Sequence, residues 1–585
     1  MLRLNRHANY DRYPAIHVPV EGPCAWRGWM AILEQIRAQV SQGARVIAVE
    51  CYPGVLEDEL AEAFSQGIQP ALLLRTRDCW RPSAEIEALV ARDLTDDPVF
   101  GRMNGFTIDD FAEPGLVDQA RAALDSAQGL VLILGTGTQL IAPAPDLLIY
   151  ADMARWEIQL RLRAGRVGNL AAGNERERPA LKYKRAYFLD WRVADRIKRE
   201  LFERVDFLLD TNEACAPKLV TGEAFRGALR HAATRPFRVV PFFDPGPWGG
   251  QWMREVCGLP EGPPNYAWCF DCVPEENSLL LDFGGVRIEA PAIDLVFQHP
   301  RELLGDPVHA RFGAEFPIRF DFLDTMQGGN LSLQVHPLTE YIYDKFGMAY
   351  TQDESYYMLD AGEDACVYLG VKQGVDRAAM LRDLYSAQSD GAPFDATRYV
   401  NRWPARKHDH FLIPGGTIHC SGANAMVLEI SATPYIFTFK LWDWGRLGLD
   451  GRPRPIHLEH GAANIQWDRD TEWTRRNLVN RVEPIADGPG WKEERTGLHE
   501  REFIETRRHW FDSPVSHDAS RGVHVLNLVE GREAIVESPS RAFEPFTVHY
   551  AETFIVPAAA GKYTVRSAEG AGRCATVRAS VRTAP

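Results

Sequence analysis

Two segments of this chain combine histidine with other side chains that bind divalent metals. Residues 331–337, Leu-Ser-Leu-Gln-Val-His-Pro, hold Gln334 and His336, and two later donors are Glu354 and His419. Alternate side chains of an extended strand face the same way, so Gln334 and His336 project to one side, about 7 Å apart. Glu354 and His419 would come from neighbouring strands. Two imidazoles, a carboxylate and an amide oxygen then converge on one divalent ion.

The surroundings of His419 strengthen this prediction. A single histidine between Val335 and Pro337 is more often a core or surface residue than a ligand. Residues 414–419, Pro-Gly-Gly-Thr-Ile-His, follow an apolar strand at residues 411–413, however. Glycines permit the tight turn that brings a histidine at a strand end toward the interior of a barrel. The pattern is typical of metal pockets in small β-barrels.

Further motifs follow one another between residues 240 and 585. They are Pro247–Gly250 (PWGG), Phe316-Pro317, Leu323-Asp324, residues 331–337, residues 354–361 (ESYYMLDA), residues 414–419, residues 443–446 (DWGR) and residues 455–459 (PIHLE). In this order they resemble the bacterial class I mannose-6-phosphate isomerases, zinc enzymes of the cupin fold. The resemblance places the four candidate donors on the family's zinc-ligand positions and implies one zinc ion per chain. It also implies all-β cupin barrels.

The activity that the resemblance implies is aldose-ketose isomerisation of a small-molecule sugar phosphate. The expected reaction converts mannose 6-phosphate to fructose 6-phosphate through an enediol, with a proton moved between C1 and C2. A Lewis-acidic metal stabilises the negative charge that develops on oxygen. An amide ligand in place of a second carboxylate leaves more positive charge on the ion, which favours this use over inert structural binding.

Three further residues are candidates for the chemistry of the pocket. Lys440 and Arg446 are cations for a phosphate or an enediolate, and Glu429 is an acid-base group. Each has a simpler alternative. Lys440 can snorkel from a strand end, Arg446 can hold the DWGR turn through backbone carbonyls, and Glu429 can support a ligating histidine.

Departures from the family pattern leave the substrate open. Relatives commonly carry an arginine where this chain has Lys440, so a cation is kept without its bidentate fork. Asp321, with Arg319 on the same strand face, stands where the family has a lysine. Leu338-Thr339 replaces an acidic pair. These changes keep a second hypothesis alive, a regulatory pseudoenzyme that binds sugar phosphate without turning it over.

The first 235 residues have a different pattern. Continuous apolar runs lie at residues 45–50, 71–74, 129–134, 146–150 and 205–209, separated by stretches typical of helices. Runs of this kind predict strands buried on both faces, as in a parallel, doubly wound α/β sheet. The layout resembles nucleoside-kinase-like P-loop domains. Because the Gly-x4-Gly-Lys-Ser/Thr motif is absent, we interpret the domain as degenerate, with a bifunctional sugar kinase and isomerase as the alternative.

Smaller motifs in the chain have simpler interpretations. Residues 135–138, Gly-Thr-Gly-Thr, can bind an anion through backbone amides, but a tight strand exit is more common. The charged run at residues 175–185 is typical of a solvated loop, with phosphate binding as the alternative. Cys269 and Cys272 lack a second pair at zinc-finger spacing and are predicted to be structural.

Turn-rich segments and changes of pattern along the sequence predict three domains. They are a kinase-like α/β domain at residues 1–240, a metal-binding cupin domain at residues 241–490 and a C-terminal cupin-like β domain at residues 491–585. Strands within residues 278–296 should begin the metal-binding domain, and a helical insertion should interrupt it at about residues 376–400. The C-terminal domain lacks a Gln-x-His pair and is predicted to be structural.

The composition of the chain limits the classes of partner and the cellular location that are expected. The 585 residues carry a formal net charge of −15, which argues against nucleic acid or an anionic membrane as a partner. Because no apolar run approaches a membrane span and no secretory leader is seen, a cytoplasmic location is expected. The 10 cysteines are then expected to be reduced. Self-association into a homo-oligomer is left open.

Overall fold

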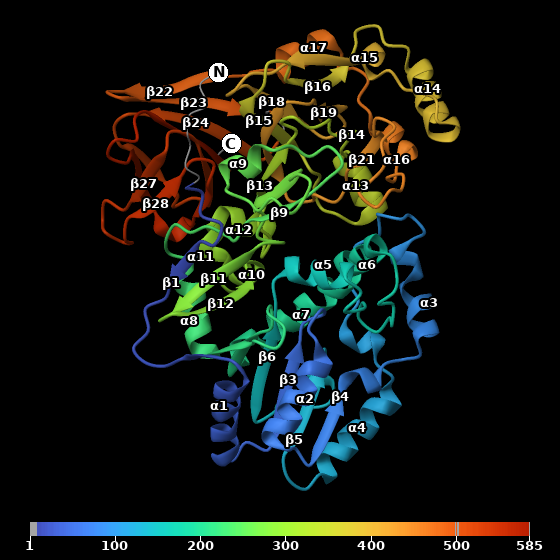
Figure 1. Cartoon of the computed structure of the whole chain (residues 1–585), viewed down its shortest axis with the longest axis vertical. Helices are drawn as coiled ribbons and strands as arrows, with labels where there is room; N and C mark the ends of the chain where they lie inside the picture. The colour runs from blue at the N-terminus through green and yellow to red at the C-terminus, as the bar shows by residue number, and fades with distance from the viewer. Residues whose placement is uncertain (1–8, 498, 500–501, 584–585) are drawn as a thin grey trace. The chain divides into compact units, whose positions relative to one another are not determined.

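The computed structural model describes residues 9–583 apart from 498 and 500–501 (Figure 1). The chain divides into two compact units. Unit 2 comprises Ala15–His231 and Ser278–Gln298, and unit 1 comprises residues 1–14, Ala232–Asn277 and His299–Pro585.

Unit 2 is built on a seven-stranded sheet in the order β2-β8-β7-β6-β3-β5-β4. Its strands are β2 (Ala25–Arg27), β3 (Val46–Cys51), β4 (Leu72–Arg75), β5 (Val131–Gly135), β6 (Leu147–Asp152), β7 (Phe207–Asp210) and β8 (Lys218–Thr221). The five strands from β7 to β4 are parallel, and β8 and β2 add antiparallel strands at one edge. The predicted parallel sheet is therefore present.

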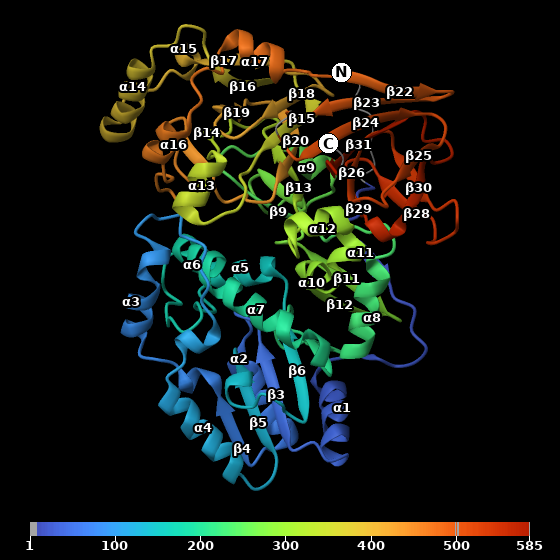
Figure 2. The same ribbon diagram turned by 180° about the vertical axis from the view of Figure 1, so that it is seen from behind.

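The central strands of unit 2 are buried on both faces. Every residue of β5 and β6 is buried, as is β3 apart from its first residue. Helices supply the cover, and α1 and α4 flank the strands in Figures 1 and 2. The helices are α1 (Trp29–Ser41), α2 (Glu57–Ile68), α3 (Ser83–Leu94), α4 (Pro114–Ser126), α5 (Arg155–Arg163), α6 (Pro179–Arg185), α7 (Trp191–Leu201) and α8 (Gly222–Ala232). This burial explains why the strands are continuous apolar runs.

Residues 278–298 differ from the prediction, because they belong to unit 2 and not to the metal-binding domain. Strands β11 (Ser278–Phe283) and β12 (Val286–Pro291) form a small sheet with β1 (Ala15–His17), and α10 (Ile293–Gln298) follows. Asp294 on α10 and Asp152 on β6 each lie 2.8 Å from the buried ammonium of Lys198. A lysine buried this deeply needs opposite charge, so Asp294 ties the segment to unit 2.

The predicted boundary at residue 240 also needs correction at the N-terminal side. Asp11 accepts a hydrogen bond from Arg238 at 2.7 Å and its backbone amide contacts Glu552 at 2.6 Å. Tyr10 donates to Asp271. These contacts assign the segment before Pro14 to unit 1, because they cover the buried Arg238.

Unit 1 contains two β domains, each made of two antiparallel sheets. The first has the six-stranded sheet β18-β15-β20-β13-β10-β9 and the five-stranded sheet β17-β16-β19-β14-β21. Its strands are β9 (Phe242–Asp244), β10 (Trp268–Cys272), β13 (Ile318–Asp324), β14 (Leu333–Val335), β15 (Glu354–Ala361), β16 (Cys366–Val371), β17 (Val400–Pro404), β18 (His410–Ile413), β19 (His419–Ser421), β20 (Ala425–Ala432) and β21 (Phe439–Trp442).

Helices are inserted between the strands of the first β domain. They are α9 (Trp252–Val256), α11 (Pro300–Leu304), α12 (Asp306–Phe312), α13 (Thr339–Phe346), α14 (Arg377–Asp390), α15 (Ala396–Tyr399), α16 (Leu458–Asn464) and α17 (Thr471–Asn477). The insertion predicted at residues 376–400 corresponds to α14 and α15. Asp376 and Asp395 cap these two helices through their side chains, which explains where each begins.

The second β domain has sheets β22-β23-β24-β31-β26-β29 and β25-β30-β27-β28, drawn in orange and red in Figure 2. The strands are β22 (Glu483–Gly488), β23 (Trp491–Gly497), β24 (Ile504–Phe511), β25 (Val515–Asp518), β26 (His524–Glu530), β27 (Glu533–Glu537), β28 (Phe546–His549), β29 (Thr553–Val556), β30 (Lys562–Ser567) and β31 (Cys574–Val581). Apolar side chains from both sheets, among them Phe511, Leu526 and Val565, form one core.

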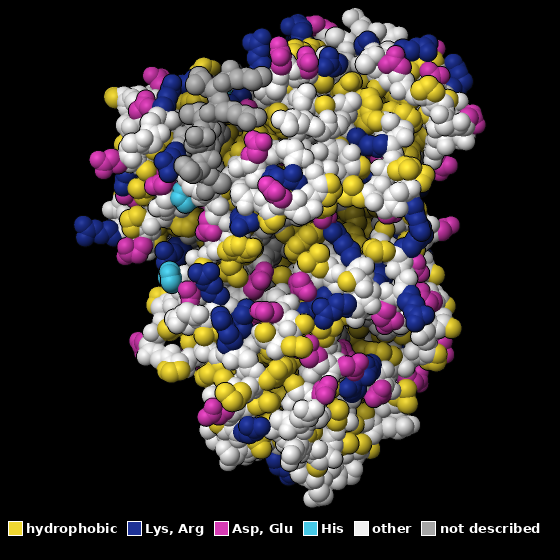
Figure 3. Space-filling model, viewed as in Figure 1, with side chains coloured by type: hydrophobic (Ala, Val, Ile, Leu, Met, Phe, Trp, Pro, Cys, Tyr) yellow, Lys and Arg dark blue, Asp and Glu magenta, His cyan; other side chains and the backbone are white. Residues whose placement is uncertain are grey.

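Three general features follow from the described residues. Basic and acidic side chains are interspersed over the face shown in Figure 3, and neither sign dominates it. None of the described helices is both long and apolar enough to cross a bilayer. All 10 cysteines are free thiols, including Cys269 and Cys272 on β10.

Candidate metal centre

The four predicted ligands come from both sheets of the first β domain. Gln334 on β14 and His419 at the start of β19 are direct register partners in the five-stranded sheet, and His336 follows β14. Glu354 begins β15 in the six-stranded sheet. The expectation of neighbouring strands therefore applies to His419 alone. Glu354 reaches the other donors across the interior, because the two sheets face each other.

The carboxylate of Glu354 lies between the two imidazoles. Its Oε2 is 3.0 Å from Nε2 of His336, and its Oε1 is 2.8 Å from Nε2 of His419. Ligand atoms of these three residues all lie within 4.8 Å of one another, and each residue is at most 1% exposed. The amide nitrogen of Gln334 lies 3.2 Å from Nε2 of His419. Turning this amide over brings its oxygen to the same position.

Backbone carbonyls fix the orientation of both imidazoles. Nδ1 of His336 lies 3.2 Å from the carbonyl oxygen of Phe437, and Nδ1 of His419 lies 2.9 Å from that of Thr417. A carbonyl only accepts hydrogen bonds, so each Nδ1 carries the proton and each Nε2 presents a lone pair to Glu354. This is the arrangement by which proteins orient metal-ligating histidines.

The donor set fits a divalent metal ion. In that tautomer two nitrogen lone pairs face two carboxylate oxygens, an arrangement that is repulsive unless positive charge lies between them. Nε2 of His336 and Oε1 of Glu354 are buried without a hydrogen-bond partner. Two imidazoles, a carboxylate and an amide oxygen satisfy the ligand preference of zinc, and related ions use the same donors.

The charges of this centre are strongly coupled. Burial raises the pKa of Glu354, but in the absence of a metal ion the positive charge of protonated imidazoles beside it outweighs this and holds the pKa well below its usual value. Burial lowers the pKa of His336, and the charge of Glu354 reverses this to a net increase. The interior is therefore arranged to hold positive charge next to one permanent carboxylate.

A cavity of about 300 Å³ opens beside the ligands. It is lined by Gln334 from the centre and by other polar and aromatic side chains of the first β domain. Three cationic side chains line it, Lys440, Arg454 and Arg319, and Trp248 and Tyr435 supply aromatic walls. A volume of this size accommodates a small polar molecule.

Two of these cations, Lys440 and Arg454, differ in their environment. Lys440 on β21 faces Gln334 across the strand pair, and burial together with Arg454 lowers its pKa to about 7. Arg454 donates to both oxygens of Asp443, at 3.3 and 3.1 Å, and to Ser332 at 3.0 Å. Its guanidinium also lies 4.8 Å from the ring of Trp248.

Glu429 lines the same cavity and is linked to the metal centre. Nε2 of Gln352 donates to Glu354 at 3.0 Å and to Glu429 at 3.3 Å. Burial, followed by the charge of Glu354, raises the pKa of Glu429 to about 7. Arg319 pairs with Asp321 and lies 3.8 Å from Glu429, so the Asp321 that replaces the family's lysine is itself neutralised.

Arg446 lies outside the lining of the cavity. It donates to the carbonyl of Asn330 and, at 2.7 Å, to Asp443. These bonds hold the turn at residues 443–446, which is the simpler of the two predicted uses. Arg454, eight residues later, takes the place in the cavity that was predicted for Arg446.

Sequence reasoning overlooked two residues of this site. Arg454 directly precedes the 455–459 motif, and Gln352 stands two residues before Glu354. The signal in the sequence that could have identified them is that each residue stands close to a recognised motif. Their use depends on contacts with Asp443 and Glu429 that lie far away in the sequence.

The smaller motifs of unit 2 also have defined places. The amides of Gly137 and Thr138 each donate to the Glu50 carboxylate at 2.7 Å, so an internal carboxylate occupies the predicted anion position. The charged run at residues 175–185 is a solvated loop only in its first part, because residues 175–178 are exposed and lie outside helices and strands. Its last cations lie on α6 and are buried, with Lys184 donating to the carbonyls of Thr95 and Asp97.

Sequence comparisons find relatives over part of the chain. A family model described as "Domain of unknown function (DUF8485)" matches residues 28–234. The mannose-6-phosphate isomerase of Streptococcus mutans is 28% identical over 214 residues, which are 36% of this chain and 62% of that protein. Mannose-6-phosphate isomerase ManA of Bacillus subtilis is 26% identical over 236 residues, 40% of this chain and 69% of that protein. Homology to mannose-6-phosphate isomerases thus extends over about 36–40% of this chain, and the chain spans about two thirds of these relatives.

Solved structures of similar proteins cover more of the chain at lower identity. The crystal structure of mannose 6-phosphate isomerase from Bacillus subtilis is 18% identical with a TM-score of 0.48, covering 59% of this chain and 99% of that one. A structure described as "mannose 6-phosphate isomerase (holo; zinc bound)" is 14% identical with a TM-score of 0.44.

Proposed function

We propose that unit 1 is a metal-dependent aldose-ketose isomerase of a phosphorylated sugar, with mannose 6-phosphate as the substrate and fructose 6-phosphate as the product. The observation that carries the proposal is the cluster of His336, Glu354 and His419 beside a cavity whose lining includes Lys440 and Arg454. The homology to mannose-6-phosphate isomerases over about two fifths of the chain supports it.

In this proposal His336, Glu354, His419 and Gln334 hold one zinc ion. When bound, such an ion acts as a Lewis acid that stabilises negative charge on the sugar's oxygen atoms. The residues of the chain orient the metal ligands, bind the sugar phosphate and transfer the proton. Backbone carbonyls of Phe437 and Thr417 keep the histidine lone pairs turned toward the centre.

The cavity residues then bind and orient the sugar phosphate. Arg454 and Lys440 carry the positive charge that a phosphate requires, and the guanidinium of Arg454 is held in place by Asp443. Lys440 keeps the cation that relatives supply as arginine. Trp248 and Tyr435 close the walls and exclude water around the reacting carbons.

Moving a proton between C1 and C2 requires a base within reach of both carbons. Glu429 faces the cavity and is positioned by Ser431, Gln352 and Arg319 at 3.0, 3.3 and 3.8 Å. We assign it the role of proton acceptor and donor. Gln352 also links it to Glu354, so it would support the carboxylate ligand and not the ligating histidine that the sequence suggested.

The test is to incubate the purified full chain with zinc and mannose 6-phosphate and to measure fructose 6-phosphate. Turnover that is lost in His419→Ala supports the assignment. A wild-type rate no higher than that of His419→Ala would refute it. If labelled mannose 6-phosphate still binds without turnover, the pseudoenzyme hypothesis replaces the isomerase.

Glu429 needs its own variant. Glu429→Gln keeps the size and the hydrogen bond to Gln352 but removes the base, so kcat should fall at least about 100-fold with the bound zinc unchanged. Arg446→Gln is the matched control, because it changes a polar residue outside the cavity. A Glu429→Gln enzyme with full kcat would exclude the proton-transfer role.

A further inference from the structure

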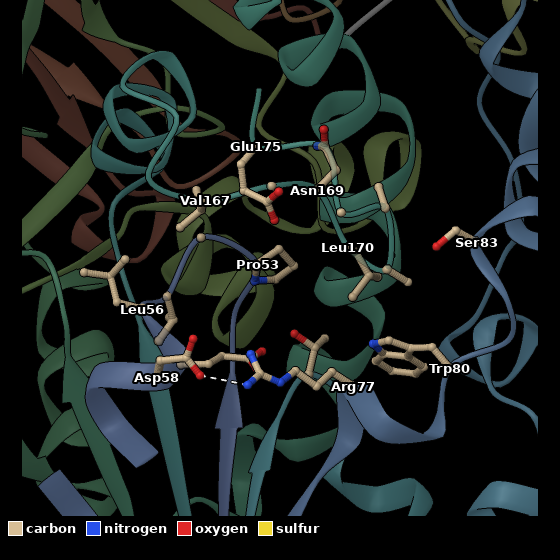
Figure 4. A pocket seen from close by; sticks show the side chains of 18 of the residues that line it. Pro53, Leu56, Asp58, Arg77, Trp80, Ser83, Val167, Asn169, Leu170 and Glu175 are labelled. Atoms are coloured by element: carbon tan, nitrogen blue, oxygen red, sulfur yellow. Dashed lines mark hydrogen bonds and ion pairs between the residues drawn. The ribbon is translucent and has the colours of Figure 1, made fainter. Parts of the chain in front are cut away.

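A second, larger cavity lies in unit 2, away from every residue assigned above. Its volume is about 680 Å³, within the range of small-molecule binding sites. Three of its walls are the loops that follow β3, β4 and β5, and the fourth is the segment at residues 166–175 after α5. Figure 4 shows these segments around the opening, with Pro53 at its centre.

The position of this cavity is one at which parallel sheets bind ligands. From β3 the chain first adds β4 and β5 on one side and then β6 and β7 on the other, so the order of the strands reverses at β3. Ligands of open α/β sheets bind beyond the carboxyl ends of the strands at such a reversal, because the loops diverge there. The loops at residues 53–59, 77–83 and 136 all leave the carboxyl ends of their strands.

The acidic first turn of α2 disfavours the binding of a triphosphate at the start of this helix. The first turn of α2 carries Glu57, Asp58 and Glu59, which compensate the helix dipole that an external phosphate would use. The amides of Gly137 and Thr138 after β5 are already bonded to Glu50. This side of the cavity therefore presents hydrogen-bond acceptors and not an anion cradle.

Positive charge lies on the opposite walls. Arg77 is paired with Asp58 at 2.8 Å, as the dashed line in Figure 4 marks. Nε of Arg81 donates a hydrogen bond to the carbonyl oxygen of Ala112, at 3.1 Å. Among the described residues, no ion pair is found for the terminal nitrogens of Arg81 or for Arg166, which also lines the cavity. Both residues line the cavity, so their guanidinium groups can pair with an anionic ligand.

Trp80 and Glu175 complete the site. Trp80 lies next to Arg77 along the cavity wall, and Glu175 projects from the opposite segment (Figure 4). An aromatic face packs against the C–H face of a sugar ring, while carboxylates accept hydrogen bonds from neighbouring hydroxyls. The wall thus combines one aromatic surface, acceptors on one side and free guanidinium groups on the other.

We propose that this cavity binds a monosaccharide phosphate. The phosphate group is held by Arg81 and Arg166, the ring packs on Trp80, and the hydroxyls donate to Glu57 and Glu175. The site is separate from the metal centre, and its occupation does not depend on isomerase activity in unit 1. The chain would then recognise the same class of ligand in both units.

Hydrogen-deuterium exchange of the full chain tests the proposal, because it localises binding. Mannose 6-phosphate should slow exchange in peptides that cover residues 53–59, 77–83 and 166–175. The ligand concentration for half-maximal protection should rise about tenfold in Arg166→Gln and in Arg81→Gln, since each loses a charged contact. Trp80→Leu should weaken protection by mannose 6-phosphate and leave any effect of inorganic phosphate unchanged.

Controls make each outcome decisive. Arg102→Gln removes an exposed arginine of unit 2 outside the cavity and should leave the titration unchanged. Unchanged thermal unfolding shows that each variant is folded. Protection by ATP with Mg²⁺ but not by sugar phosphates would overturn the proposal in favour of a nucleotide site, and so would the absence of protection in these peptides. Exchange around Gln334–Glu354 and turnover are followed separately, so failure of the isomerase is distinguishable.

Discussion

The two β domains of unit 1 both bury histidines between facing sheets, yet they surround them with opposite charges. In the first domain the carboxylate of Glu354 lies within 3.0 Å of both imidazoles. In the second, His509, His517 and His524 are at most 6% exposed, and the rings of the first two lie 4.6 Å apart. Here the guanidinium of Arg578 lies 3.3 Å from Nδ1 of His517.

The partners decide what each histidine cluster can do. Nδ1 of His524 lies 2.8 Å from the hydroxyl of Tyr563, and Nε2 of His509 lies 3.3 Å from Glu493, whereas Nδ1 of His509 and Nε2 of His517 are buried without a hydrogen-bond partner. Arg578 places a permanent positive charge where a cation would have to bind. Among the described residues, ligand atoms converge only in the first domain. The candidate metal centre of this chain is therefore the cluster in which a carboxylate lies between the imidazoles.

Removal of a ligand should give the largest difference between the two clusters. His419→Ala deletes a donor that contacts Glu354, and bound zinc should fall from about one ion per chain to less than about one tenth. Elemental analysis after dialysis measures this. The matched variant His517→Ala in the second domain should keep the full zinc content. Equal loss of zinc in both variants would contradict the comparison.

Removal of the cation in the second cluster should destabilise the protein. Arg578→Met removes the buried cation beside Glu493 and leaves Nδ1 of His517 without its partner, and the free energy of unfolding should fall by about 3 kcal/mol. Arg573→Met is the control, because that exposed arginine only stacks on Trp510 and should cost less than about 1 kcal/mol. Urea unfolding followed by tryptophan fluorescence measures both. A more stable Arg578→Met would show that the arginine is not the group that holds this cluster.

Acid should weaken the second cluster. Burial, with the neighbouring Arg578 and His509, holds the pKa values of His517 and His524 well below the usual value of 6.5. Below pH 6.5 the unfolded chain binds protons at these residues and the folded chain does not, so stability falls as the pH falls. Each histidine contributes up to about 1.4 kcal/mol per pH unit.

The histidine contribution can be separated from other acid effects. His517→Phe should reduce the slope of unfolding free energy against pH between 6.5 and 5 by about 1 kcal/mol per unit. His17→Gln changes a histidine whose side chain is 89% exposed and should leave the slope unchanged. The same slope in wild type and His517→Phe would place the acid sensitivity elsewhere.

The smallest effect should separate two arginines near the first cluster. Arg446→Gln loses hydrogen bonds that hold a turn and should lower stability by about 1 kcal/mol without changing KM. Arg454→Gln should raise KM for mannose 6-phosphate about tenfold, because its guanidinium lines the cavity. Steady-state kinetics beside thermal unfolding measures both. A KM increase in Arg446→Gln alone would reverse the assignment.

Local pattern was sufficient for several parts of the molecule. The apolar runs of β3, β5 and β6 predicted buried parallel strands, because a strand that is covered on both faces carries apolar residues at nearly every position. Asp376 and Asp395 begin helices through hydrogen bonds to residues two or three positions away. Gln334 and His336 share a strand face through their spacing alone. Such features depend on neighbours in the chain and are readable from it.

The sequence by itself determined the composition of the metal centre: two imidazoles, one carboxylate and one amide, each recognisable from its motif. Only the tertiary structure decided that Glu354 lies between the imidazoles, that Arg454 replaces Arg446 in the cavity and that Asp294 joins residues 278–298 to unit 2. It also decided that His517 of the second domain lies beside Arg578. The physical reason is that charge acts through space, so the partner that sets each group's role is chosen by how distant strands pack.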